Sequence, residues 1–499
     1  MSIFASTAIA RTGILAHQRA IQVTARNIAN QSTEGYSRQR PVFTPIASVF
    51  EADGFPQGGG SRILKVDRIV DQGIQSQLER ERSLLSYDRT LEVGISRIEG
   101  VLDELGGTGL STGLNQFFDA LNDLADAPGD PATREAAVQF GDNLVTQIRS
   151  VDLRLEQLET DTNQEISNTV DEVNEITLEL RELNRQIRSR EFGADGGSEL
   201  RDRRNLLLEE LGEKIDFTSF ERDDGSLAIF VGGGALLVDG DARAELQVST
   251  QQPVALADPT FFNIFVALNN TQQGPITQAI SGGRIGALLD LRDDRIQDFR
   301  QQIDEFAFTL SDRINAVHLA GRGTVDANAR NFFVDRNVAV AGTPPGTALS
   351  SVAGAAQSLG INPDLLADPR HVAAGLPAAG PAALGDNSNA LALAAVQGTS
   401  QAVFQVGDPP GGPATGNVLS LNQFLSSQAG LLGAELRGLQ ARVASDELSV
   451  AELEDRRSSI SGVSIDEEVT NLLRFQRGFE ASARVLQTVD ELLERLLSI

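Results

Sequence analysis

The chain has 499 residues, a net charge of −27 and no cysteine. This length exceeds what one hydrophobic core usually holds, so we expect two to four domains. The acidic charge argues against nucleic-acid and membrane-surface partners, and the absence of cysteine excludes disulfides, thiolate nucleophiles and sulfur metal sites.

The first predicted element is an amphipathic helix at the N-terminus. Its apolar residues recur every three or four positions, the period of one helix face. The members that we expect to pack in an assembly are Ile14, Ile21 and Ile28. The pattern stops within 30–40, because Gly35 and Pro41 break a helix. Residues 1–10 carry no basic leader, so we expect no cleaved secretory signal.

Three further apolar stripes predict long helices in the middle of the chain. The first lies in a helix from about residue 143 to residue 190, which would be a rod of roughly 70 Å. The other two run over 296–317 and 432–453. Helices of this length are typical of a bundle or a coiled coil.

Shorter, β-like stretches separate these helices. Residues 216–220 and 227–231 flank Asp224-Gly225, a pair suited to the tight turn of a hairpin. Segment 323–415 is rich in alanine, glycine and proline, so we interpret it as a looser insertion with short helices such as 389–397.

The last predicted element is an amphipathic helix that ends almost at Ile499. Gln476 and Asp490 interrupt its apolar seam at two heptad positions. The stripe consists of Val469, Leu472, Phe479, Ala483, Leu486, Leu493 and Leu497. Because chain ends are usually frayed polar tails, two amphipathic ends indicate a self-associating protein.

Together these elements predict a mainly α, multidomain α+β fold with β-rich insertions. We expect the terminal helices to pair as a coiled coil beside a long-helix bundle. The predicted domain limits are 1–60 with 463–499 for a terminal helical assembly domain, 61–215 with 276–322 and 416–462 for the bundle, 216–275 for an inserted β domain, and 323–415 for the insertion.

Residues capable of chemistry are sparse. His17, His318 and His371 are dispersed, and none lies in a metal or nucleophile motif, so packing or solvation explains them. Two glycine triplets, at 58–60 and 232–234, lack the lysine and hydroxyl residue of a phosphate loop. The sequence therefore predicts no catalytic residue, no cofactor, no metal and no enzyme.

One segment carries a family signature. ARNIANQSTEGYSR, at 25–38, resembles the Asn-x-x-Asn and Thr-x-Gly-Tyr pattern of flagellar rod, hook and junction proteins. The residues that carry it are Asn27, Asn30, Thr33, Gly35 and Tyr36. Its Gly-Tyr-Ser-Arg ending favours the first hook-associated proteins, and 461–497 resembles their C-terminal helix. Internal segments with the same resemblance are 114–135, 199–217, 282–294 and 385–397.

The resemblance implies an extracellular structural subunit that forms a ring joining hook to filament. It implies self-assembly, contacts with the hook protein and with the second hook–filament junction protein, and no small-molecule substrate. It also implies export by the flagellar type III system and a cytoplasmic chaperone that holds the C-terminal region. The alternatives are a hook or rod subunit and a secreted coiled-coil scaffold or adhesin.

The two ends also differ in charge. Residues 1–40 carry five arginines and one glutamate, a net charge of +4, whereas 463–499 carry seven acids and four arginines, a net charge of −3. We expect this difference to set the register of the pairing and to make assembly sensitive to salt. We also expect both ends to be disordered in the monomer and to fold on assembly. Asn27, Asn30, Gly35 and Tyr36 should end the first helix and redirect the chain.

Overall fold

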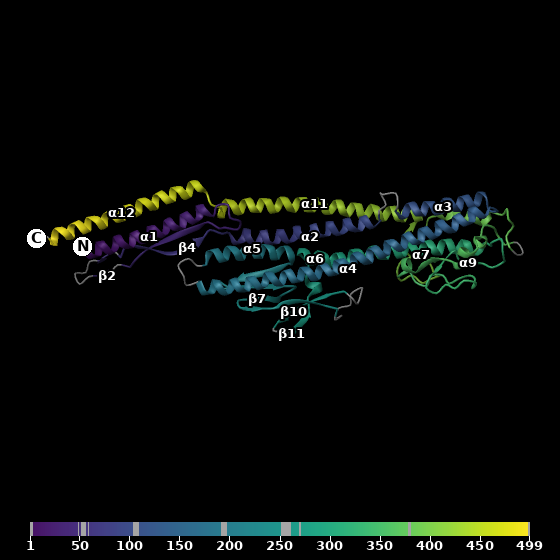
Figure 1. Ribbon diagram of the computed structural model, residues 1–499, viewed down its shortest axis with the longest axis horizontal. Helices are drawn as coiled ribbons and strands as arrows, with labels where there is room; N and C mark the ends of the chain where they lie inside the picture. The colour runs from purple at the N-terminus through teal and green to yellow at the C-terminus, as the bar shows by residue number, and fades with distance from the viewer. Residues whose placement is uncertain are drawn as a thin grey trace.

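The computed structural model describes residues 3–47, 49–50, 56–57, 59–102, 109–190, 197–250, 261–268, 271–377 and 381–497. The molecule is elongated, and its long helices run roughly along its long axis (Figure 1). Both termini lie at one end, in a slender terminal arm that contains α1 (Ile3–Ala29) and α12 (Ile465–Leu497). We call the remaining, thicker part of the molecule the rod.

A β-hairpin completes the terminal arm. Strand β1 (Gln39–Pro45) pairs antiparallel with β4 (Ser61–Arg68), and both contact α1. A small ladder of β2 (Val49–Phe50) and β3 (Pro56–Gln57) extends the hairpin. The predicted limits placed residues 39–60 in the terminal helical domain and residues 61–68 in the long-helix bundle, so these strands were not predicted.

The rod is built on long helices that lie side by side. Helix α2 packs against α11 on one side and against α5 and α6 on the other, and α4 packs against α5 and α6 in turn. These helices are α2 (Gln72–Leu102), α4 (Pro131–Arg190), α5 (Ser198–Lys214), α6 (Gly283–Asp290) and α11 (Leu421–Ser461). A π-helical turn, η3 (Leu291–Arg295), connects α6 to α7 (Ile296–Ala320).

Helix α4 is longer than the sequence predicted. Its 60 residues span about 90 Å, and the predicted start near residue 143 was wrong. The helix begins at Pro131, where proline suits the first turn and the Asp130 carboxylate accepts a hydrogen bond from the Ala132 amide at 2.9 Å. The stripes predicted at 296–317 and 432–453 lie within α7 and α11, as expected.

The far end of the rod holds a large aromatic core. Helix α3 (Leu110–Asp126) packs against α4 and contributes Phe117 and Phe118, both fully buried. Phe332 and Phe333 from the insertion lie 5.5 Å and 5.8 Å from the Phe117 ring, between ring centroids. Burial of such side chains is worth about 1.5–3 kcal/mol each, so this end of the rod has its own stable core.

Two small antiparallel sheets pack against α4. The first has the order β5-β6-β7-β8 and the second the order β11-β10-β9. Their strands are β5 (Phe217–Glu221), β6 (Leu227–Val231), β7 (Ala235–Asp239), β8 (Ala242–Arg243), β9 (Glu245–Ser249), β10 (Asn263–Leu268) and β11 (Thr271–Pro275). The predicted hairpin is confirmed: β5 pairs with β6, and Gly225 in the turn has a φ of +77°.

The insertion consists of short elements around the aromatic core. They are β12 (Phe333–Asp335), α8 (Ala355–Ser358), β13 (Leu359–Ile361), α9 (Pro363–Ala367), α10 (Ser388–Ala395), β14 (Gln401–Ala402) and β15 (Val418–Leu419). The mainly α fold with small inserted sheets and paired terminal helices is confirmed. The domain limits stay a prediction. None of the described helices has the length and hydropathy that crossing a bilayer requires.

Candidate assembly site in the terminal arm

Helices α1 and α12 form a close antiparallel pair. A Cβ atom on Gly13 would lie 2.8 Å from Ser482 Oγ, and one on Gly478 would lie 2.5 Å from the His17 ring. Residue numbers rise along α1 as they fall along α12, so the helices run in opposite directions. Glycine at these two positions lets the helices approach more closely than larger residues would permit.

The buried face of α12 repeats every seven residues. Glu468, Phe475 and Val489 are at most 6% exposed, and half-buried Ser482 is the third member of this repeat, between Phe475 and Val489. Four residues predicted for the interface lie four positions after the members of this repeat, and all are half-buried: Leu472, Phe479, Leu486 and Leu493. A seven-residue repeat of this kind is the pattern of a coiled coil.

Three residues of the predicted seam lie elsewhere. Val469 is 41% exposed, and Gln476 and Asp490 are also exposed, so none of them faces α1. The prediction that Gln476 and Asp490 interrupt the seam was wrong, because the seam passes through Phe475 and Val489, one position earlier in the chain. Val469 stays a candidate for contacts with other chains.

On α1 the buried face is made mainly of small side chains. Ala16, Ala20 and Val23 are at most 4% exposed. The larger residues predicted for assembly lie beside this face and are half-buried: Ile14, Ile21 and Ile28. The pair therefore leaves part of its predicted apolar surface uncovered within one chain.

An aromatic cluster joins the two helices to the hairpin. The Phe43 ring of β1 lies 5.6 Å from the His17 ring and 5.7 Å from the Phe475 ring, measured between centroids. The Arg474 guanidinium lies over the Phe475 ring, 5.0 Å from its centroid. Burial lowers the pKa of His17, so this ring is neutral at neutral pH.

Asn27 is the centre of the predicted turn motif. It is 1% exposed, and its Nδ2 donates to the Gln39 carbonyl and to Glu468 Oε2, both at 2.9 Å. Its Oδ1 accepts from the Gln39 amide at 3.0 Å and from the Tyr36 hydroxyl at 2.8 Å. An asparagine amide has two donors and two acceptor sites, so all are used. Asn27 therefore ties the end of α1 to β1 and to α12.

The other motif residues shape the turn itself. Asn30 Nδ2 donates to the Arg26 carbonyl at 3.0 Å, and Asn30 Oδ1 accepts from the Thr33 hydroxyl at 3.2 Å. Gly35 has a φ of +72°, and a Cβ atom there would lie 2.6–2.8 Å from three carbons of the Leu206 side chain. Glycine is thus required at position 35 both for its backbone conformation and for space against α5.

Glu468 was not singled out from the sequence. It is 2% exposed, and besides the Asn27 contact it accepts from Arg38 Nε at 2.8 Å. Arg38 also pairs with Glu467 at 2.6 Å, and its amide donates to the Ser461 carbonyl at 2.9 Å. In the sequence, only the opposite net charges of the two terminal segments pointed to such a contact. These ion pairs join the two segments.

A second buried pair fastens the arm to the rod. Arg68 of β4 pairs with Asp202 of α5 at 2.7 Å, and Asp202 also accepts a hydrogen bond from the Ser37 amide at 3.3 Å. Burial, with the charge of Asp202 as a second cause, raises the pKa of Tyr36 to about 12. Tyr36 is therefore a neutral phenol at physiological pH and can donate to Asn27.

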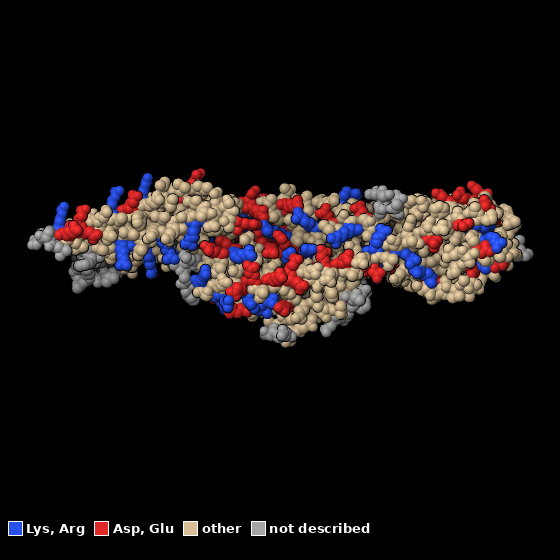
Figure 2. All heavy atoms as spheres, in the orientation of Figure 1, with Lys and Arg blue, Asp and Glu red and all other residues tan. Residues whose placement is uncertain are grey.

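The outer surface of the arm carries exposed apolar side chains. Figure 2 shows charged side chains crowded over the middle of the rod, whereas the surface of the arm is formed mostly by other residues. Leu15 of α1 is 56% exposed. The exposed apolar residues of α12 are Ile465, Val469, Leu473, Val485 and Leu492. An apolar surface of this kind on a helix pair indicates contacts with other chains.

The structure gives the histidines packing roles. His318 is fully buried; its Nδ1 lies 2.7 Å from the Arg330 carbonyl and its Nε2 accepts from the Ala373 amide at 3.0 Å. Burial lowers its pKa to about 4, so it is neutral. His371 lies 3.5 Å from Asp326, near the surface. Among the described residues, no group of three or more His, Asp or Glu side chains could hold a metal ion.

Family models match two parts of the chain. The flagellar hook-associated protein FlgK helical domain matches residues 95–333, and the flagellar basal body rod FlgEFG protein C-terminal model matches residues 456–499. The second match covers the whole of α12, the C-terminal helix of the arm. A solved structure of the flagellar hook junction protein FlgK from Burkholderia pseudomallei has the same fold, with a TM-score of 0.61 at 15% identity, covering 77% of this chain and 100% of that one.

Relatives match along the whole chain. Flagellar hook-associated protein 1 of Bacillus subtilis strain 168 is 24% identical over 529 residues, covering 100% of this chain and 98% of its own. The proteins of that name from Escherichia coli K12 and Salmonella typhimurium LT2 are 25% and 26% identical, each covering 98% of this chain and 98% and 99% of their own. With the domain matches and the shared fold, these relatives show that the chain belongs to the flagellar hook-associated protein 1 family.

Proposed function

We propose that the protein is a structural subunit of the bacterial flagellum that forms the junction between hook and filament and is required for filament assembly. The proposal rests on the structure of the terminal arm, together with the membership of the chain in this family. The arm pairs the two ends of the chain and leaves apolar residues such as Leu473 and Val485 about half exposed. Such a surface becomes buried when arms of neighbouring subunits pack together.

The partners follow from this position in the flagellum. Copies of the chain form a ring, the hook protein lies on one side of it, and the second hook–filament junction protein lies on the other. The site of action is outside the cell, and the flagellar type III system exports the chain. Before export the apolar face of α12 needs cover, which supports a cytoplasmic chaperone bound to the C-terminal region.

We also infer that the arm orders on assembly. Its packing within one chain uses small and half-buried residues, so little apolar burial offsets the conformational entropy lost by ordering two helices. Arms of neighbouring copies would supply the missing burial. Protease treatment of the free subunit should remove both ends and leave the rod, and survival of both ends would contradict this inference.

The same observations favour a purely structural role. The polar contacts in the arm join secondary-structure elements, and each is accounted for by packing or attachment to the rod. We therefore infer no enzymatic activity, no cofactor, no small-molecule substrate, and no nucleic-acid or membrane partner.

Deletion of the gene tests the proposal. Electron microscopy of the deletion strain should show hooks without filaments, with flagellin shed into the medium, and re-expression of the full chain should restore filaments. Filaments that remain firmly attached to hooks in the deletion strain would contradict the proposed function.

A further inference from the structure

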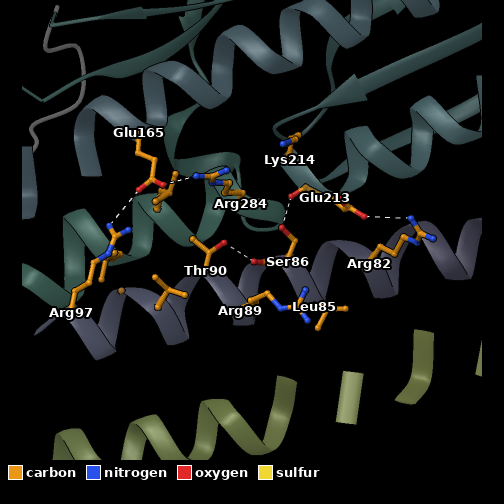
Figure 3. Close-up of a pocket in the computed structure, with 14 residues that line it drawn as sticks. Arg82, Leu85, Ser86, Arg89, Thr90, Arg97, Glu165, Glu213, Lys214 and Arg284 are labelled. Carbon is orange, nitrogen blue, oxygen red and sulfur yellow. Dashed lines mark hydrogen bonds and ion pairs between the residues drawn. The ribbon is translucent and has the colours of Figure 1, made fainter. Parts of the chain in front are cut away.

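A cleft with an apolar floor lies on the rod between α2 and α6. Its volume is about 430 Å³, and α4 and the end of α5 contribute to its walls (Figure 3). Leu288 and Leu291 form the floor and are 1% exposed, whereas Val93 on the rim is 48% exposed. The apolar surface that a side chain from outside can reach therefore comes from Val93 and half-buried Leu85 on the rim.

Basic residues surround this floor in a strongly acidic protein. The basic lining residues are Arg82, Arg89, Arg97, Lys214 and Arg284, against the acidic residues Glu165 and Glu213. Three of these basic residues also pair with carboxylates outside the lining: Arg82 with Glu454, Arg89 with Glu447 and Lys214 with Glu172. Arg97 and Arg284 approach the same Glu165 carboxylate from two sides (Figure 3), and the Arg97 pair is loose, at 3.7 Å. The Arg97 side chain is 49% exposed and that of Arg89 is 56% exposed. Two guanidinium groups that share one carboxylate leave capacity for a further carboxylate.

The outer face of α4 carries the complementary pattern. Asp171, Glu175, Leu178 and Glu182 recur at intervals of three and four residues, so they form one stripe along the helix. Leu178 is 45% exposed in the middle of this stripe. Val173, Ile176 and Leu180 are buried on the opposite face. We call this set of four residues the acidic stripe; it pairs one exposed leucine with carboxylates.

The cleft and the acidic stripe lie at the same height along the rod. Helices α2 and α4 run in opposite directions (Figure 1), and the contact between Arg97 and Glu165 fixes their relative position. At ~1.5 Å per residue, Arg89 and residue 173 both lie roughly 12 Å from that contact in the direction of the arm. Two copies standing side by side could therefore bring stripe and cleft together without sliding along the axis.

We propose that the acidic stripe of one copy docks in this cleft of a neighbouring copy. Leu178 enters beside Val93 and Leu85, and Asp171 and Glu175 meet Arg89 and Arg97. The contact joins two different surfaces, so it can repeat from copy to copy around a ring. It also offsets repulsion between subunits that each carry a charge of −27. The inference rests on the self-assembly in the proposed function and adds the rod surfaces through which copies meet.

Cysteine trapping tests the contact directly, because the native chain has no cysteine. Val93→Cys and Leu178→Cys chains are co-expressed, and their assembled flagella are oxidised. We expect disulfide-linked dimers that contain one chain of each kind, and no dimers when either variant is expressed alone. Assembled flagella without mixed dimers, or with dimers of Val93→Cys alone, would overturn the proposal.

Charge-reversal variants provide an independent test of the contact. The cleft variant is Arg89→Glu with Arg97→Glu, and the stripe variant is Asp171→Arg with Glu175→Arg. Each should lower the yield of mixed dimers at least about tenfold, because like charges would then face each other across the contact. Combining both variants in one chain should restore the yield. Failure of the combined chain to recover, while its monomer unfolds like the native one, would contradict the contact.

Matched controls separate this contact from general charge effects and from the proposed function. Arg437→Glu on α11 and Asp119→Arg on α3 reverse exposed charges outside both surfaces and should leave the yield unchanged. Normal filaments and normal trapping in all charge variants would refute the contact and leave the junction role intact. The junction role fails separately, when deletion of the gene leaves filaments attached.

Discussion

The rod and the terminal arm are both made of long helices, but they bury different side chains. In the rod, Phe117, Phe118 and Phe306 are at most 1% exposed and belong to a continuous core. In the arm, the most buried apolar residues of α1 are Ala20 and Val23, both fully buried, and larger side chains lie half-buried beside them. The difference supports our inference that the rod is stable as a single chain, whereas the arm is completed by other chains.

The largest expected effect is on the stability of the rod. Phe117→Ala removes a fully buried ring in contact with other phenylalanines, so the free energy of unfolding should fall by about 3–5 kcal/mol. Denaturant unfolding of the free subunit measures this. The matched arm variant, Phe479→Ala, should leave that unfolding transition in place and should impair assembly. An equal loss of stability from both variants would refute the comparison.

The connection between arm and rod should be nearly as sensitive. Gly35→Val forces a β-branched residue into a positive φ and against Leu206, at a local cost of about 2–3 kcal/mol. We expect faster proteolysis at 30–40 and loss of motility, with little change in rod unfolding. Gly411→Val is the control, because Gly411 has a similar φ of +73° with no neighbour within 4 Å. Normal junctions in the Gly35 variant would show that the turn is dispensable.

A half-buried carboxyl in the rod near the arm should make stability depend on pH. Burial, with the nearby charge of Glu209 as a further cause, raises the pKa of Glu79 to about 7. A raised pKa means that this contribution to stability is complete below the unfolded pKa near 4.5 and is lost as the pH rises through 7. Glu79→Gln should therefore unfold like the native chain at pH 4 and be about 2–3 kcal/mol more stable at pH 8, once solvent screening of this half-buried group is allowed for. Equal stabilisation at both pH values would contradict this assignment.

The smallest expected effect concerns charge in the arm. Arg38 pairs with Glu467, whose side chain is 62% exposed, and with buried Glu468. Exposed pairs are worth about 0–1 kcal/mol, and the Debye length shortens from ~10 Å at 0.1 M salt to ~3 Å at 1 M. Higher salt should slow assembly of free subunits, as followed by light scattering, without changing rod unfolding. Assembly rates that do not depend on ionic strength would contradict a role of these charges in assembly.

The helices of the arm and rod could be predicted because their patterns are local. The three-and-four spacing along α1, α7, α11 and α12 reports which side of each helix is apolar. The hairpin of β5 and β6 was equally local, since Asp224-Gly225 specifies its turn. Strand β1 was missed because Pro41 and Pro45 interrupt its alternating pattern, which disfavours a strand.

The candidate site could be predicted only in part. Asn27 and Gly35 were found through the family signature, but the hydrogen bond from Asn27 to Glu468 joins residues 441 positions apart. No local pattern encodes such a contact, because it depends on the register of two helices at opposite ends of the chain. The same holds for the seam of α12: a shift of one position moves Phe475 inward and Gln476 outward, and the spacing of apolar residues did not resolve it.

Amide hydrogen exchange, compared between the free subunit and assembled flagella, tests the central claim most directly. In the free subunit, amides of α4 should be strongly protected while those of α1 and α12 exchange almost freely, because the arm opens without unfolding the rod. In assembled flagella, α1 and α12 should become as protected as α4. Strong protection of α1 and α12 in the free subunit would contradict the account, because the arm would then be complete in one chain.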